Sequence, residues 1–425
     1  MSDVQLCDQP LAWRASRVGF QGKYTEAGPL YARCQAIQEA VLGPDHPRLA
    51  TTLGNWAALL YEQDVPTFAM TSSRLPVTFQ GKPEEAGALF NRSLAIREKA
   101  LGPDHPDVAT SLNNLSCLLE SQGKYGQAGP LYERSLAIRE KAALGPDHPD
   151  VATSLNNLAC LLESQGKYAE AESLYARCQA IEAKVLGPEH RRLATTLYNW
   201  AALLHKQGKY AEAESVYTRC QEIEEKALGP EHPSLATTLN SRAKLLTTQG
   251  NYTEAEALYA QCQAIQEKIL GPEHPSLATT LDKLAVALYK QGKFGQARPL
   301  FERSLAIVEK VRGSDHPDVW SLLGNWACLL KSQGQFAEAE PLYARCQAIE
   351  EKVRGPEHPS LATTLNNRAS VLFSQGKNEE AAPLLERSLA VTEKALGPDH
   401  PDVATIRNNL VNLSQKQERA VGTIH

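Results

Sequence analysis

The chain has 425 residues, a formal net charge of −5, 42% hydrophobic residues and only 6% aromatic residues. Its lysines and arginines form no run, so we expect neither nucleic acid nor an acidic membrane surface as a partner. No apolar stretch reaches the ~18 residues of a membrane span, and the first residues lack the basic and apolar regions of a signal peptide, so we expect a cytoplasmic protein without membrane insertion.

The first 46 residues contain two predicted helices. Residues 1–21 keep an apolar stripe at helical spacing, although Arg14 stands where a later copy has Trp56. We interpret this stretch as a degenerate N-terminal cap helix. Residues 22–46 form a complete second helix that ends in a Gly-Pro-Asp-His turn.

From residue 22 to residue 414 the chain repeats one pair of helices, and residues 191–233 are the clearest copy. The first helix, helix A, and the second, helix B, each carry an apolar stripe at steps of three and four residues. Gln207-Gly208-Lys209 separates them, and a glycine in the left-handed conformation closes a helix without a Cβ clash. Helix B therefore folds back on helix A.

Two copies depart from this pattern. In the second copy, about residues 64–80 are inserted between the helices, and two prolines with a Thr-Ser-Ser run favour a loop. One interpretation is that this loop is a lid that binds a partner. The other is that it is a tolerated surface insertion or a gene-model artefact. One extra residue at Ala142-Ala143 should be absorbed at the end of its helix B. The last helix A is predicted at about 403–417, and residues 415–425 are a polar C-terminal tail.

Histidine marks the period of the repeat. Nine of the eleven histidines stand in the turn before helix A, and the last seven are spaced by 42 residues: His46, His105, His148, His190, His232, His274, His316, His358 and His400. Self-similarity at a fixed period with two helices per period predicts a helical solenoid of about nine repeats. We expect the preceding Asp or Glu to cap helix A, with His and Pro in its first turn. One histidine per repeat brings no ligand set together, so no metal site is predicted.

Small residues are expected where two helices cross, and one alanine of helix B recurs in all nine copies: Ala27, Ala86, Ala128, Ala171, Ala213, Ala255, Ala297, Ala339 and Ala381. With the aromatic residues around it, this pattern resembles tetratricopeptide repeats. The common tetratricopeptide repeat has a period of 34 residues. The 42-residue period and phrases such as SLNNLACLLESQGKYAEAESLYARC resemble the kinesin light chain and nephrocystin-type subgroup. The resemblance implies an all-α, right-handed superhelical solenoid of antiparallel helix pairs.

One position of helix B carries Cys34, Cys178, Cys220, Cys262 and Cys346, and serine in the other four copies. This interchange indicates a small filler rather than disulfide bonds. Nucleophile elbows and phosphate-binding glycine loops are missing too. We therefore expect no catalytic residues, no cofactor and no enzyme activity.

The polar face of helix A carries a ladder of asparagine side chains, interrupted by Ser241, Asp282 and Lys283. An amide both donates and accepts, so it can bind a peptide backbone of any sequence. In the kinesin light chain family, asparagines of a like phrase contact an extended cargo peptide. The alternative interpretation is copying by recent duplication. The predicted peptide-binding residues are Asn55, Asn113, Asn114, Asn156, Asn157, Asn199, Asn240, Asn325, Asn366, Asn367 and Asn409.

These features predict a non-catalytic scaffold that binds peptide segments of partner proteins in a concave, asparagine-lined groove. One alternative is a kinesin light chain-type cargo adaptor for a microtubule motor. A kinesin heavy chain is a partner only if an N-terminal coiled coil is missing from this chain. Another alternative is the repeat region of a signalling NTPase-type protein.

Overall fold

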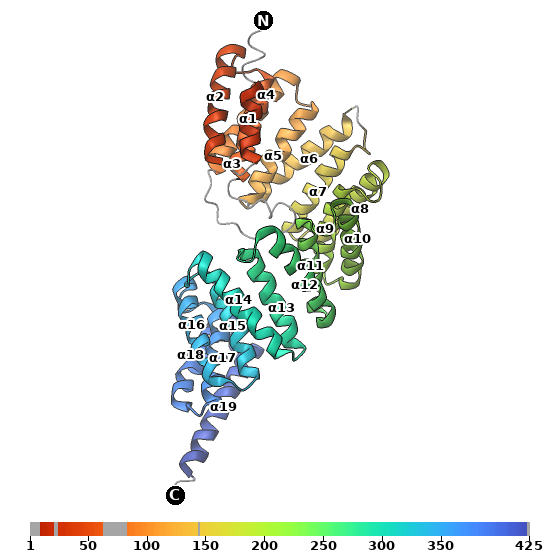
Figure 1. Ribbon diagram of the computed structural model, residues 1–425. Helices are drawn as coiled ribbons and strands as arrows, with labels where there is room; N and C mark the ends of the chain where they lie inside the picture. The colour runs from red at the N-terminus through yellow and green to blue at the C-terminus, as the bar shows by residue number, and fades with distance from the viewer. Residues whose placement is uncertain (1–8, 21–23, 63–82, 143–144, 423–425) are drawn as a thin grey trace. The chain divides into compact units, whose positions relative to one another are not determined.

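The computed structural model describes residues 9–20, 24–62, 83–142 and 145–422. Every regular element in these ranges is an α-helix, and the helices alternate between the predicted helix A and helix B (Figure 1). By contacts, the chain divides into two compact units, residues 1–241 and 242–425. The prediction of an all-α fold built from stacked helix pairs is confirmed.

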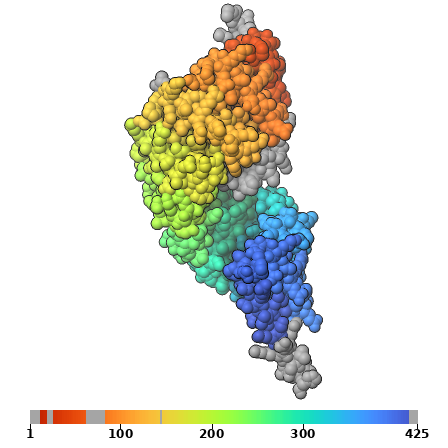
Figure 2. Space-filling view, turned by 180° about the vertical axis from the view of Figure 1, so that it is seen from behind, coloured from red at the N-terminus to blue at the C-terminus, as the bar shows by residue number. Residues whose placement is uncertain are grey.

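Helix A of successive repeats is α1 (Gln9–Phe20), α3 (Pro47–Glu62), α5 (Pro106–Ser121), α7 (Pro149–Ser164), α9 (Arg191–Lys206), α11 (Pro233–Thr248), α13 (Pro275–Lys290), α15 (Pro317–Ser332), α17 (Pro359–Ser374) and α19 (Pro401–Gly422). Helix B is α2 (Tyr24–Leu42), α4 (Pro83–Leu101), α6 (Tyr125–Lys141), α8 (Tyr168–Val185), α10 (Tyr210–Leu228), α12 (Tyr252–Leu270), α14 (Phe294–Arg312), α16 (Phe336–Arg354) and α18 (Asn378–Leu396). Helix B packs against its own helix A and against the next one, as α6 packs against α5 and α7 and α16 packs against α15 and α17. Within each unit, neighbours in sequence are neighbours in space (Figure 2).

The repeated histidine starts helix A. In all nine copies its Nδ1 accepts a hydrogen bond from the backbone N–H two residues later, at 3.1 to 3.3 Å. The prediction that Asp or Glu caps helix A is therefore wrong, because the neutral imidazole supplies the acceptor that the first-turn amides lack. The acid instead forms an exposed ion pair with a lysine of the following helix B, as Asp104 does with Lys141 at 2.8 Å.

The alanine at the crossing of helix A and helix B has no exposed surface in any of the nine copies. Four residues later an aromatic ring is buried in eight copies, as Tyr175 is in α8, and Leu385 takes its place in α18. A side chain larger than a methyl group at the alanine position would push the two helices apart. This confirms the prediction of a small residue at the crossing.

The alternating cysteine or serine position ties helix B to the helix A of its own repeat. Ser135 Oγ donates to the carbonyl oxygen of Ala109 at 2.7 Å, and Cys178 Sγ donates to that of Ala152 at 3.1 Å. Burial raises the pKa of the Cys178 thiol to about 12. The two residue types interchange because both are small and both can donate this bond.

Some predictions rest on residues outside those described: the insertion at 64–80 and Ala143 of the one-residue slip. The division into cap helix, array and tail stays a prediction, although α1 lies where the cap helix is expected and packs against α2. The last helix, α19, extends to Gly422, beyond the predicted end near Gln417. Its sequence there, QKQERA, consists of good helix formers.

Buried acids of helix B face the next helix A. Glu182 accepts a hydrogen bond from Thr196 at 2.8 Å. Glu224 has the same position one repeat later, but its Oε2 is buried without a hydrogen-bond partner. Burial raises the pKa of Glu224 to about 7, against the opposing effect of a hydrogen bond from Thr238. The next repeat carries Gln266 at this position.

We predict that Glu224→Gln removes a pH dependence of stability. Between about pH 4.5 and pH 7 the folded protein holds the Glu224 proton that the unfolded chain releases, so the free energy of unfolding falls as the pH rises and is constant above this window. At about pH 8 the variant should exceed wild type by roughly 1 to 3 kcal/mol, and at about pH 4 the two should agree. Hydrogen exchange in α9 and α10 at both pH values measures this. A constant difference between variant and wild type would contradict it.

Candidate functional site

The predicted asparagines lie on one face of the helix A elements, at two adjacent positions of each copy. The first position carries Asn113, Asn156, Asn240 and Asn366, and the second carries Asn55, Asn114, Asn157, Asn199, Asn325, Asn367 and Asn409. Asn55 is exposed, Asn113 is 8% exposed, and the others are half-buried. We call these two positions together the asparagine face.

Most of these amides are used between repeats. The Nδ2 of a second-position asparagine donates to the Oδ1 of the first-position asparagine on the preceding helix A. The pairs are Asn157 with Asn113 at 2.9 Å, Asn199 with Asn156 at 3.1 Å, and Asn409 with Asn366 at 2.9 Å. The ladder is therefore a set of hydrogen bonds that joins successive helix A elements, a role that the sequence analysis missed.

Two of the residues that interrupt the ladder, Ser241 and Asp282, preserve this pairing. Tyr198 and Ser241 take the two positions in one step, and their hydroxyl oxygens lie 2.8 Å apart. In another step Asn325 donates to both carboxylate oxygens of Asp282 at 3.1 Å. Burial raises the pKa of Asp282 to about 6, against the lowering effects of Asn325 and Lys283. The interruptions are therefore alternative partners and not gaps in the ladder.

Glycine takes the first position in two copies, at Gly54 and Gly324, and so offers no side chain to the following helix A. The second-position residues that follow are Asn114 and Asn367, and neither side chain has a hydrogen bond to any part of the chain that the structure describes. A Cβ atom at Gly54 would lie 3.5 Å from Ser93 Oγ, an ordinary contact. Packing does not require glycine there, and glycine inside a helix costs about 0.5 to 1 kcal/mol relative to alanine.

A signal for this pairing is present in the sequence. Tyr198 at the first position of one copy and Ser241 at the second position of the next both replace asparagine. Comparing each copy only with itself does not reveal this relation, because the partner is one repeat away. The same comparison singles out Asn114 and Asn367 as the positions that follow a glycine.

The residues that the structure describes contain no group of three or more His, Cys, Asp or Glu side chains that could hold a metal ion. The nine turn histidines are separate from one another and cap their own helices. None of the described helices is long and apolar enough to cross a membrane.

Stacked helix pairs with one polar side-chain face define a helical repeat protein. The sequence profile of the tetratricopeptide repeat matches residues 19–65, 78–141, 121–184, 192–268, 236–310, 276–352, 318–394 and 360–420. The chain therefore belongs to the tetratricopeptide repeat family. No curated protein matches it.

Among solved structures, the chain is similar to nearly identical tetratricopeptide-like repeats of a putative kinesin light chain from Podosopora anserina, with 31% identity and a TM-score of 0.45 over 49% of this chain and 98% of that one. It is also similar to BtubC (BKLC) from P. vanneervenii, with 20% identity and a TM-score of 0.49 over 55% of this chain and 94% of that one. A signal transduction ATPase with a tetratricopeptide repeat sensor from Pyrococcus horikoshii has 13% identity and a TM-score of 0.61, over 87% of this chain and 53% of that one. The structural similarity to this ATPase supports the assignment of the fold.

The inter-repeat hydrogen bonds predict different outcomes for two neighbouring asparagines. Asn157→Ala removes the donor to Asn113 Oδ1, which is nearly buried, and should lower local stability by roughly 0.5 to 1.5 kcal/mol. Asn114→Ala removes no hydrogen bond and should leave stability equal or slightly higher, because alanine favours the helix. Hydrogen exchange in α5 and α7 is the measurement. Equal effects of the two substitutions would show that the amide pair contributes nothing to stability.

Proposed function

We propose that this protein is a non-catalytic scaffold that binds peptide segments of partner proteins along its asparagine face, the face that lines the concave groove in tetratricopeptide arrays. Membership of the family supports protein binding in general. The polar character of this face supports a peptide as the bound form, since a backbone offers both donors and acceptors. The partners are proteins, and the proposal needs no cofactor.

The observation that carries the proposal is the pair of unused amides at Asn114 and Asn367. Each is half-buried, and its two N–H donors and its carbonyl oxygen have no partner among the residues that the structure describes. An extended backbone laid across either point would satisfy both kinds of group. The amides already paired between repeats would hold these two residues in place by fixing the spacing of neighbouring helix A elements.

The alternatives use the same surface. A cargo adaptor of the kinesin light chain type and the sensor region of a signalling ATPase-type protein both bind partners through repeats of this kind. Similarity to a putative kinesin light chain and to an ATPase with a repeat sensor is consistent with either. We therefore propose the shared activity, protein binding, without assigning the chain to a motor or an ATPase.

We predict that changing Asn114 and Asn367 together to alanine weakens partner binding and leaves folding intact. Each lost hydrogen bond is worth roughly 0.5 to 1.5 kcal/mol, so the affinity for a peptide bound at either asparagine should fall about two- to tenfold for each hydrogen bond lost. The measurement is capture of partner proteins from a cell extract by the full chain, followed by titration of a captured partner. The melting curve of the variant should match that of wild type.

Two matched variants serve as controls. Glu133 and Glu386 are exposed on helix B, one in each unit, so changing both to alanine should leave affinity unchanged. Introducing asparagine at Gly54 and Gly324 gives Asn114 and Asn367 the partner that other copies have, and it should weaken binding while both asparagines remain. If the alanine variant keeps every partner at wild-type affinity and the glutamate variant loses them, binding lies on the helix B side and the proposal fails.

A further inference from the structure

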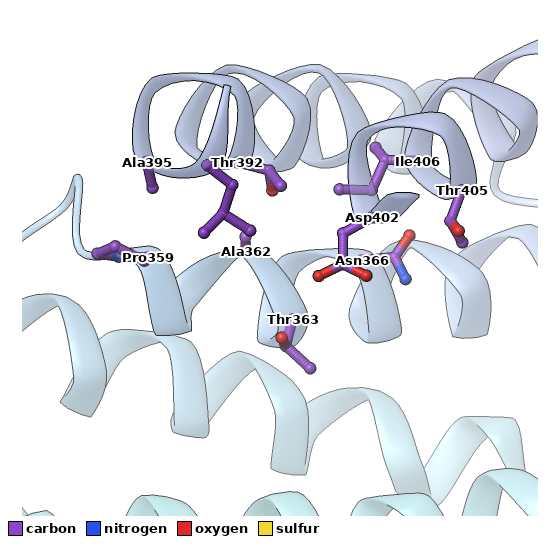
Figure 3. Close-up of a pocket in the computed structure, with 10 residues that line it drawn as sticks. Pro359, Ala362, Thr363, Asn366, Thr392, Ala395, Asp402, Thr405 and Ile406 are labelled. Carbon is purple, nitrogen blue, oxygen red and sulfur yellow. The ribbon is translucent and has the colours of Figure 1, made fainter. Parts of the chain in front are cut away.

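The last repeat contains a cavity that is open to the asparagine face. It measures about 240 Å³ and lies between α17, α18 and α19. Ala362, Thr363, Asn366, Thr392, Asp402 and Ile406 are among the residues that line it. In Figure 3 Asp402 and Asn366 lie at one end of the cavity, and Pro359 and Ala395 lie at the other. A single water needs only about 10 to 15 Å³ of such volume, so the cavity can take a whole side chain.

The cavity exists because one residue of helix B is short. Thr392 is buried. Val308 is as short at this position, but it packs in an apolar cluster with Leu305 and Leu323. The other seven repeats carry a longer side chain here: Gln38, Arg97, Arg139, Glu182, Glu224, Gln266 and Glu350. In those repeats a long side chain lies between helix A of its own repeat and helix A of the next. The hydroxyl of Thr392 is turned to its own helix, where it donates to the Ser388 carbonyl oxygen at 2.8 Å.

Arg97 shows what the space accommodates when it is filled. Its Nη1 donates to the carbonyl oxygen of Asp107 at 3.1 Å and to Ser111 Oγ at 2.7 Å. Its Nη2 donates to Thr51 Oγ1 on the preceding helix A at 3.4 Å. One repeat later Arg139 is 7% exposed and makes the corresponding bonds to the Asp150 carbonyl oxygen and to Ser154. The site is therefore built to hold a guanidinium group.

Most of this guanidinium site is present in the last repeat. Thr363 stands at the position of Thr51, and Asp402 stands at the position of Asp107. Only the serine is changed, to Ile406, which adds an apolar wall beside Ala362 for the methylene groups of an arginine. The Asp402 carboxylate lies 3.6 Å from His400 Nδ1, and that atom accepts the Asp402 N–H.

We propose that this cavity binds an arginine side chain supplied by a partner protein, in the place that Arg97 and Arg139 fill from within the chain. The guanidinium donates to the Asp402 carboxylate and carbonyl oxygen and to Thr363 Oγ1, and the aliphatic stem packs between Ala362 and Ile406. Arginine fits better than lysine, because a planar fork reaches several acceptors at once. The inference rests on the proposed protein-binding function and adds the side chain that the partner presents.

The test uses N-acetyl-L-arginine amide as the probe and the methyl resonances of Ile406 in the full chain as the readout. We expect saturable shifts in the millimolar range, as a single side chain would give. N-acetyl-L-citrulline amide has nearly the same shape as the arginine probe but no charge. N-acetyl-L-lysine amide has the charge but lacks the planar guanidinium group. Both should shift Ile406 much less. No saturable shift with the arginine probe, or equal shifts with all three, would overturn the inference.

Two variants locate the probe. Asp402→Asn should weaken binding of the arginine probe roughly tenfold, since it removes a charge-assisted hydrogen bond. Thr392→Arg places at this position the side chain that Arg97 contributes in its own repeat and keeps the Ile406 methyl groups as the readout, and it should abolish probe binding. Unchanged probe affinity in either folded variant would place the probe elsewhere. Failure of the probe in wild type leaves the Asn114 and Asn367 experiment untouched, so the two proposals fail separately.

Discussion

The structure depends on the close crossing of helix A and helix B at an alanine that has no exposed surface. A methyl group at that point lets the two helices approach until the aromatic ring four residues later, such as Tyr175, is enclosed by helix A. One pair cannot bury both its apolar faces, so helix B also packs against the next helix A, as α6 does against α7. Stability is therefore mainly a sum of contacts between neighbours, which explains how one unit can be copied along the chain.

Polar side chains set the geometry that apolar packing leaves open. Apolar surfaces tolerate sliding because the hydrophobic effect is not directional. The histidine cap fixes where helix A begins, and the buried cysteine or serine fixes helix B to the carbonyl of its own helix A. The bond from Asn157 to Asn113 then fixes the distance between successive helix A elements. Each of these contacts recurs along the chain because its residues are copied with the unit.

Function is proposed where a copy lacks one of these contacts. Within the described parts of the chain, Asn114 and Asn367 have unpaired amides because the residue one repeat earlier is glycine. The cavity beside Asp402 exists because Thr392 replaces a longer side chain. In an array of near-identical units, a missing internal partner leaves polar groups that a second molecule can satisfy. The proposed backbone contacts and the proposed arginine contact follow the same principle.

The sequence by itself determined the period, the helix pairs and the alanine at each crossing, because these depend on local spacing and on the size of one side chain. It also placed the asparagines on one face of helix A. Only the tertiary structure decided which partner each side chain has. A hydrogen bond needs two atoms about 3 Å apart. The histidine rather than the acid meets this requirement at the start of helix A. Asn157 meets it with Asn113, which belongs to the preceding repeat, and spacing within one helix does not predict the distance between residues of different repeats. For the same reason the cavity at Thr392 appears only when α17, α18 and α19 are packed together.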